Sequence, residues 1–258
     1  MKFRFLFIFY FFSQTVVGQD SVEVTSYRIG TDTLQLHNTI YYPDNDSISF
    51  INLHDDENTS VEAGLLFISK YGGSLLQLQH SGKRYFNFKL KGQSFSFDPN
   101  RIFTKSGIKA TLSKQNIYRE DAAREVKIFS DSLLKNIANK KLVIALHNNT
   151  EKGLSILSYK KNGTEAKNTG RLYINKLMSK HDFILTTQYS IFNYLKRRKI
   201  NVVLQHHNPV DDGSLSVYAA KKRIAYINIE ALHGHLDEQI RMLEAIKNLI
   251  YRNYVQRF

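Results

Sequence analysis

Four ionisable residues stand where apolar stretches of the chain end. His54 and Glu57 follow the apolar segment 47–53, His147 closes segment 141–147, and Glu230 closes segment 224–230. Imidazole nitrogens and carboxylate oxygens are zinc ligands, and three such ligands leave a fourth position for water. Zinc lowers the pKa of that water toward about 7 and polarises a carbonyl, and a further carboxylate can act as general base. His54, Glu57 and His147 could therefore bind one zinc ion, with Glu230 as the base.

Each of these residues, taken alone, also has an ordinary structural explanation. An isolated H-x-x-E pair is often a solvated turn, and a histidine at a strand end is often a hydrogen-bonded rim residue. Glu230 differs, because a buried carboxylate costs several kcal/mol unless it is paired or protonated. Segment 96–103, SFDPNRIF, adds Asn100 and Arg101, and an arginine fork matches a carboxylate through two hydrogen bonds. A zinc hydrolase and a set of structural polar residues both stay open at this point.

The elements that would position these residues alternate along the chain. Apolar or alternating segments predict strands, and amphipathic segments predict helices. The strands are expected at 47–53, 74–79, 84–90, 141–147, 200–205 and 224–230, and the helices at 59–72, 119–140, 187–199, 214–223 and 236–256. This order predicts an α/β fold, a three-layer α/β/α single domain with a mixed, mostly parallel central sheet. In such sheets, ligands bind at the carboxyl ends of the strands.

The first eighteen residues have the layout of a secretory signal peptide. Lys2 and Arg4 precede an apolar run, residues 5–12, which is too short to span a bilayer. We therefore expect cleavage near Gly18, a catalytic domain over 19–258, and a periplasmic or extracellular location. No later stretch is apolar over the roughly 20 residues that a transmembrane helix needs, so we expect no membrane span. The chain has no cysteine, so any metal must be bound by histidine and carboxylate.

The chain is basic, with a formal net charge of +13 over 258 residues. A composition of 42% hydrophobic and 12% aromatic residues is that of a folded protein. A basic surface can attract nucleic acid, an anionic membrane or an acidic wall polymer. The densest clusters, 196–199 and 221–223, fall at predicted helix ends, where cations interact favourably with the helix dipole. We therefore interpret them as solvated helix ends and expect no nucleic-acid partner.

Taken together, the motifs resemble the zinc carboxypeptidase superfamily, and within it most closely the succinylglutamate desuccinylase/aspartoacylase branch. The shared order is H-x-x-E, then D-x-N-R-x-F, then a strand ending in L-H-N, then a strand ending in glutamate. NRIF and LHNNT resemble segments of that branch nearly letter for letter, and the resemblance covers residues from about 25 to 235. It implies an α/β/α fold with zinc on His54, Glu57 and His147.

By the same resemblance, Asn100 and Arg101 would hold a substrate carboxylate and Glu230 would activate water. Two positions depart from the family pattern. Ala145 stands two residues before the second histidine, where relatives often carry an acidic residue, and Gln93 is the other. Gln93 stands where the family has an arginine that polarises the scissile carbonyl, and Lys89 or Lys91 is the candidate substitute.

We therefore expect an exported zinc metallohydrolase, of carboxypeptidase or amidohydrolase type, that cleaves an amide next to a free carboxylate. A cell-wall peptide is a candidate substrate. His207 follows the predicted strand 200–205, together with His206, and is a further candidate substrate contact. The alternatives are a peptidase-like envelope protein that binds without turnover, an N-acyl amino acid deacylase, and a membrane- or polyanion-binding protein that uses the basic clusters.

Overall fold

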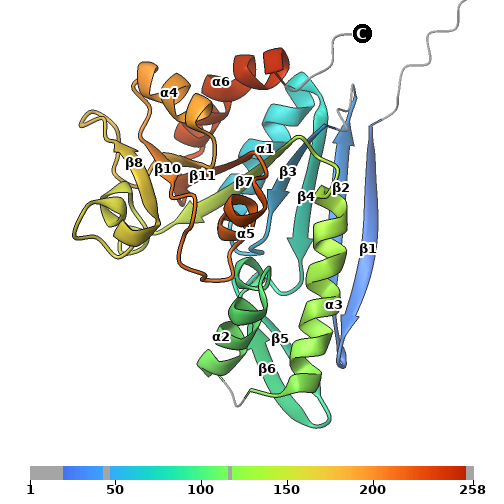
Figure 1. Ribbon diagram of the computed structural model, residues 1–258. Coiled ribbons are helices and arrows are strands. Elements are labelled where there is room, and N and C mark those ends of the chain that lie inside the picture. The colour runs from blue at the N-terminus through green and yellow to red at the C-terminus, as the bar shows by residue number, and fades with distance from the viewer. Residues whose placement is uncertain (1–19, 43–46, 116–117, 254–258) are drawn as a thin grey trace, which may run out of the picture.

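The computed structural model describes residues 20–42, 47–115 and 118–253 (Figure 1). The strands are β1 (Ser21–Ile29), β2 (Asp32–Tyr41), β3 (Ile48–Asn52), β4 (Gly73–Gln79), β5 (Phe86–Leu90), β6 (Gln93–Phe97), β7 (Leu142–Asn149), β8 (Thr169–Tyr173), β9 (Phe183–Thr186), β10 (Val202–Gln205) and β11 (Tyr226–Leu232). The α-helices are α1 (Asn58–Tyr71), α2 (Lys105–Gln115), α3 (Glu120–Ile137), α4 (Tyr189–Arg197), α5 (Leu215–Lys222) and α6 (Leu236–Asn253). Short 3-10 helices are η1 (Pro99–Arg101), η2 (Ile156–Tyr159) and η3 (Ala166–Asn168). The predicted signal peptide, residues 1–18, lies outside the described residues.

A mixed sheet forms the centre of the fold. Its nine described strands run in the order β1-β2-β4-β3-β7-β11-β9-β10-β8, and β5 and β6 form a separate hairpin. The central strands β4, β3, β7 and β11 are mutually parallel, whereas antiparallel pairs extend the sheet on both sides. The carboxyl ends of the parallel strands therefore meet at one edge.

Helices cover both faces of this sheet. Helices α1, α4 and α6 pack on one face, and α2, α3 and α5, with the β5–β6 hairpin, pack on the other. The strand β7 shows why both faces of the sheet need a cover of helices. Leu142, Ile144 and Leu146 belong to the first apolar cluster, whereas Val143 and Ala145 belong to the second. Because side chains alternate along a strand, His147 emerges on the face that α2, α3 and α5 cover.

The predicted fold class is confirmed, and each segment predicted as strand or helix overlaps the corresponding element. Lysines and arginines of the two basic clusters occupy the last turns of α4 and α5, as expected. The hairpin β1–β2, the strands β6, β8 and β9, and the helix α2 were not predicted. Strand β1 illustrates the cause: it is exposed along almost its whole length, so burial imposes little apolar pattern on it, and its alternation stops after Val22 and Val24. Among the helices described, none is long and apolar enough to cross a membrane.

Candidate metal centre and adjacent pocket

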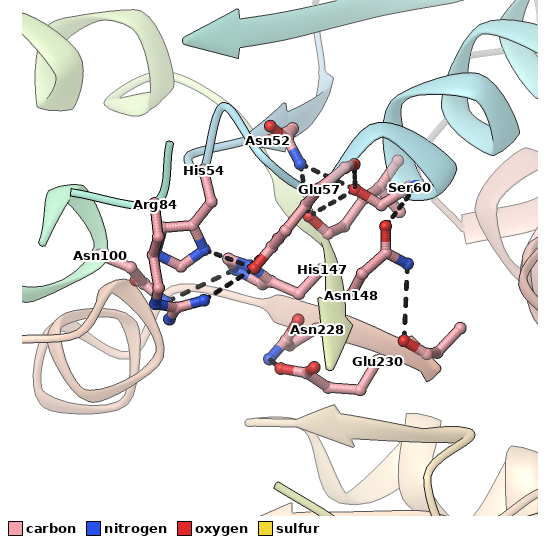
Figure 2. A network of polar contacts seen from close by, with 12 residues as sticks. Asn52, His54, Glu57, Ser60, Arg84, Asn100, His147, Asn148, Asn228 and Glu230 are labelled. Atoms are coloured by element: carbon pink, nitrogen blue, oxygen red, sulfur yellow. Dashed lines mark hydrogen bonds and ion pairs between the residues drawn. The ribbon is translucent and has the colours of Figure 1, made fainter. Parts of the chain in front are cut away.

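The three residues predicted to bind metal come together at the carboxyl edge of the parallel strands (Figure 2). His54 follows β3, Glu57 caps the start of α1, and His147 lies in β7. His54 Nδ1 is 2.7 Å from Glu57 Oε1, and His147 Nδ1 is 2.8 Å from Glu57 Oε2. One ligand atom from each residue lies within 4.8 Å of the others, and all three residues are buried.

This donor set fits a zinc-type cation. A tetrahedral zinc ion with bonds of about 2.0–2.1 Å holds its ligand atoms about 3.3 Å apart, which lies within the 4.8 Å that separates the three ligand atoms here at most. His54 Nε2 lies 2.8 Å from Asp98 Oδ1, so Nε2 donates its hydrogen to a carboxylate and Nδ1 faces the centre. Such a contact orients a ligating imidazole and raises its basicity. The site could therefore hold a divalent metal ion.

The electrostatics of the cluster also favour a cation. Burial by itself lowers the pKa of His54, but attraction to Glu57 and the hydrogen bond to Asp98 outweigh burial and raise this pKa to about 9. Burial raises the pKa of the Glu57 carboxyl, but His54 and His147 outweigh it and hold the pKa well below its usual range. Burial likewise raises the pKa of Asp98, and the hydrogen bond from His54 outweighs it and lowers that pKa. Two buried carboxylates are thus kept ionised by neighbouring positive charge.

A second set of polar side chains fixes the start of α1 against the end of β7. Asn52 Nδ2 donates to Ser60 Oγ at 2.8 Å and to the Leu146 carbonyl at 3.2 Å. Ser60 N donates to Asn148 Oδ1 at 2.8 Å, and Asn148 Nδ2 donates to Gln239 Oε1 of α6 at 2.9 Å. These contacts hold the helix that carries Glu57 in place beside the strand that carries His147 (Figure 2).

Arg84 is a site residue that the sequence analysis missed. Its Nη1 lies 3.0 Å from Glu57 Oε1 and its Nε 3.4 Å from Asp98 Oδ2, and 37% of its side chain is exposed. Figure 2 shows its guanidinium beside His54 and the Glu57 carboxylate. It is the only arginine between His54 and Asn100 in the sequence, which is the one signal that could have found it.

The substitutes expected for the family arginine lie elsewhere, on the β5–β6 hairpin. Lys91 pairs with Asp121 at 3.0 Å, and Gln93 Oε1 accepts a hydrogen bond from Arg119 at 3.3 Å. Lys89 has an exposed side chain on β5. Neither Lys89 nor Lys91 therefore supplies a cation at the metal centre. The cation there is Arg84, whose side chain reaches Glu57 and Asp98 from the turn before β5.

Beside the metal centre lies a small pocket, of about 80 Å³, that contains the predicted catalytic and carboxylate-binding residues. Glu230 is paired with His147 across the parallel strands β11 and β7, so both side chains emerge on the same face. The pocket is lined by Asn100, Arg101, Leu154, Tyr159, Glu165, Asn168, Leu185, Asp212, Ser214, Ser216, Tyr226, Asn228 and Glu230. The structure therefore brings Asn100, Arg101 and Glu230 together.

Polar atoms in this pocket are arranged for a polar ligand. Asn228 Nδ2 donates to Glu230 Oε1 at 3.0 Å. Asn228 Oδ1 and the Tyr226 hydroxyl are buried and find no hydrogen-bond partner among the described residues. Burying an unpaired polar atom costs about 1–3 kcal/mol, so a bound molecule that reached either atom would supply a hydrogen bond that the described residues do not.

Asn100 and Arg101 already have protein partners. Asn100 Nδ2 is 3.5 Å from His147 Nε2, and Asn100 Oδ1 accepts from Leu215 N at 3.1 Å. Arg101 Nη1 lies 2.9 Å from Asp212 Oδ2, in a pair whose side chains are 37% and 35% exposed. Asn100 therefore joins the pocket to the metal centre, and the guanidinium of Arg101 is already engaged by a carboxylate.

His207 is not among the residues that line this pocket. With His206 it lines a different pocket, beside Arg171 and Arg223. Its proposed contact with the substrate of Glu230 stays a prediction, and the structure places it in other surroundings.

Comparison with known proteins gives distant structural relatives only. No family model and no curated protein matches the sequence. A candidate metallopeptidase from Shewanella baltica shares 12% identity, with a TM-score of 0.47, over 91% of this chain and 87% of that one. A candidate succinylglutamate desuccinylase/aspartoacylase family protein from Shewanella amazonensis shares 12%, with a TM-score of 0.45, over 91% and 73%. The product-bound ectoine utilization protein EutE (DoeB) from Ruegeria pomeroyi shares 10%, with a TM-score of 0.47, over 95% and 71%.

Metallopeptidase and succinylglutamate desuccinylase/aspartoacylase are words printed in these names, and the resemblance predicted from the motifs is confirmed to that extent. Identities of 10–12% and TM-scores below 0.5 describe a distant likeness. The case for a function therefore rests on the geometry of the site.

Proposed function

We propose that this chain is a zinc-dependent hydrolase that cleaves an amide bond beside a free carboxylate. One observation carries the proposal: His54, Glu57 and His147 converge in a buried cluster beside a pocket that contains Glu230 and Arg101. Two imidazoles and one carboxylate form a three-ligand set of the kind found in catalytic zinc sites. A zinc ion bound there would supply Lewis acidity toward a substrate carbonyl and toward water.

Glu230 is the residue placed to move a proton. Its carboxylate is buried, faces the same side of the sheet as His147, and is held through Oε1 by Asn228. The hydrogen bond fixes the carboxylate and leaves Oε2 to accept a proton from water and to return it to the leaving amine. A positioned general acid–base of this kind typically contributes about 10²–10⁴-fold in rate.

Arg84 supplies a fixed positive charge at the mouth of the centre. Its guanidinium is held by Glu57 and Asp98, while more than a third of the side chain is exposed. A preorganised guanidinium stabilises negative charge that develops on a carbonyl oxygen in the transition state. We assign this role to Arg84.

Arg101 is the anchor proposed for the substrate carboxylate. In the structure its partner is Asp212, so a substrate carboxylate would take the place of the Asp212 carboxylate. Such an exchange is inexpensive, because a partly exposed ion pair contributes only about 0–1 kcal/mol. A free carboxylate on the substrate thus matches a site that already binds a carboxylate of the chain.

The substrate is proposed to be a peptide. The signal-like residues 1–18 support an exported enzyme, and a periplasmic or extracellular enzyme would meet envelope peptides more readily than a cytosolic N-acyl amino acid. The basic charge of the chain, +13, suits anionic wall material.

The proposal is tested with Glu230→Gln and a matched control, Glu151→Gln, which alters an exposed carboxylate just after β7. Hydrolysis of wall peptides with free or amidated C-termini, and of an N-acyl amino acid, is measured with wild type and both variants. The zinc content of each protein is measured as well. We expect Glu230→Gln to keep its zinc and lose turnover by about 10²-fold or more, and amidated peptides to react poorly.

Three results would count against the proposal. Full activity in Glu230→Gln removes the general base, and equal cleavage of amidated peptides removes the carboxylate anchor. A zinc-loaded wild type that binds these peptides without cleaving them would identify a non-catalytic binding protein.

A further inference from the structure

A second pocket, of about 310 Å³, shares no lining residue with the pocket that contains Glu230. It is formed where strands β8 and β10, the start of α4 and the end of α5 meet. Its lining consists of Gly170, Arg171, Thr187, Gln188, Tyr189, Leu204, Gln205, His206, His207, Ala220 and Arg223. The proposed hydrolase function uses none of these residues, and His207 is the one that the sequence analysis gave as a candidate substrate contact.

The charge of this pocket is one-sided. Two arginines and two histidines line it, and no aspartate or glutamate does. Arg171 lies over the ring of Tyr189, with 4.9 Å from the guanidinium carbon to the ring centroid. Within the described parts of the chain, neither Arg171 nor Arg223 forms an ion pair with a carboxylate. Their positive charge is thus available to a ligand.

The amino end of α4 adds to the positive electrostatic potential of this pocket. Gln188 caps the helix without a side-chain hydrogen bond, and the first turn of α4 carries no acidic residue. The amino end of a helix presents unpaired N–H groups and a partial positive charge, and both favour an anion.

Gln205 gives an independent sign of a ligand. It is only 6% exposed, it lines the pocket, and its Oε1 atom has no hydrogen-bond partner among the residues that the structure describes. A buried amide oxygen without a donor costs about 1–3 kcal/mol. Because the Oε1 atom is itself buried, an O–H or N–H group of a ligand would satisfy it after a small movement of the pocket wall.

We propose that this pocket binds an oxyanion that carries a neighbouring hydrogen-bond donor, such as the phosphate of a phosphorylated polyol. Arg171 and Arg223 bind the oxyanion, and the rings of His206 and His207, whose centroids are 4.3 Å apart, offer N–H donors at its edge. The Gln205 amide oxygen accepts from the neighbouring hydroxyl. The site is separate from Glu230, so it does not depend on the hydrolase proposal.

The test uses the full chain and two probes, inorganic phosphate and glycerol 1-phosphate, followed through the imidazole NMR signals and by calorimetry. We expect both probes to shift the signals of His206 and His207, and the double substitution Arg171→Ala with Arg223→Ala to weaken both probes by about tenfold or more. Gln205→Leu should weaken glycerol 1-phosphate alone. Arg197→Ala, which removes an exposed arginine at the other end of α4, should weaken neither.

Other results would overturn the proposal. Affinity for phosphate that is unchanged in the double variant would show that phosphate does not bind in this pocket. An equal loss of affinity in Arg197→Ala would reduce the effect to overall charge. Shifts confined to His54 and His147 would place phosphate at the metal centre instead. Equal weakening of both probes by Gln205→Leu would remove the donor-binding role. Melting temperatures of the variants are compared with wild type, and the exposed positions of Arg171 and Arg223 predict little change.

Discussion

Replacing Asp98 by asparagine tests whether the buried cluster is built for a metal ion. The Asp98 carboxylate accepts from His54 Nε2 and from Asn100 N, both at 2.8 Å, and its other oxygen lies 3.4 Å from Arg84 Nε. Asparagine has the same shape, and its amide oxygen can still accept from His54. The substitution therefore removes mainly the charge that raises the basicity of the His54 ring.

We expect Asp98→Asn to weaken zinc binding by about 10–100-fold, since removing a hydrogen-bond partner of a ligating histidine typically has this effect. This corresponds to about 1.4–2.7 kcal/mol of binding free energy. The zinc dissociation constant is measured by competition with a chromophoric chelator at neutral pH.

Asp56→Asn is the matched control, because it removes an exposed carboxylate next to Glu57 in the chain. It should change the dissociation constant by less than about threefold, as expected for a screened surface charge. Equal zinc affinity in wild type and a folded Asp98→Asn variant would refute the reasoning, and so would an equal loss in both variants.

Two further predictions concern the loop that carries Asp212. Asp211→Asn should lower stability at neutral pH by at most about 1 kcal/mol, because Asp211 is partly exposed. Burial raises the pKa of Asp211, but hydrogen bonds from Lys221 and Thr104 outweigh it and lower the pKa to about 2. The loss of stability in Asp211→Asn should therefore be complete above the unfolded pKa, near 3.8, and vanish as pH falls toward 2. Urea unfolding of wild type and variant across this pH range measures the loss, and a loss that does not depend on pH contradicts the prediction.

In the same loop, Gly213 has φ of +79°, and a Cβ atom there would lie 2.5 Å from Gly107 Cα and closer still to the Arg101 carbonyl oxygen. Gly213→Ala should destabilise the fold by about 2–4 kcal/mol, whereas a melting temperature equal to that of wild type would show that the loop can move away from Arg101.

The sequence by itself determined the central strands and the residues at their ends. Segments 141–147 and 224–230 are apolar at almost every position because β7 and β11 are buried on both faces. Their parallel pairing places Glu230 opposite His147, so two residues far apart in the chain could be assigned to one edge. The motif H-x-x-E supplied the remaining ligands, because a turn of three residues holds His54 and Glu57 together by local geometry alone.

Only the tertiary structure decided which charged groups surround this centre. Arg84 reaches Glu57 across 27 residues, and Asp98 reaches His54 across 44. Both lie in turns, where no apolar period marks which way a side chain points. The tertiary structure alone also decided that Asp212 forms an ion pair with Arg101. It likewise decided that His207 lines the cationic pocket and not the pocket that contains Glu230. Strand ends can be inferred from burial along the chain, whereas contacts between turns depend on how separate parts of the fold pack.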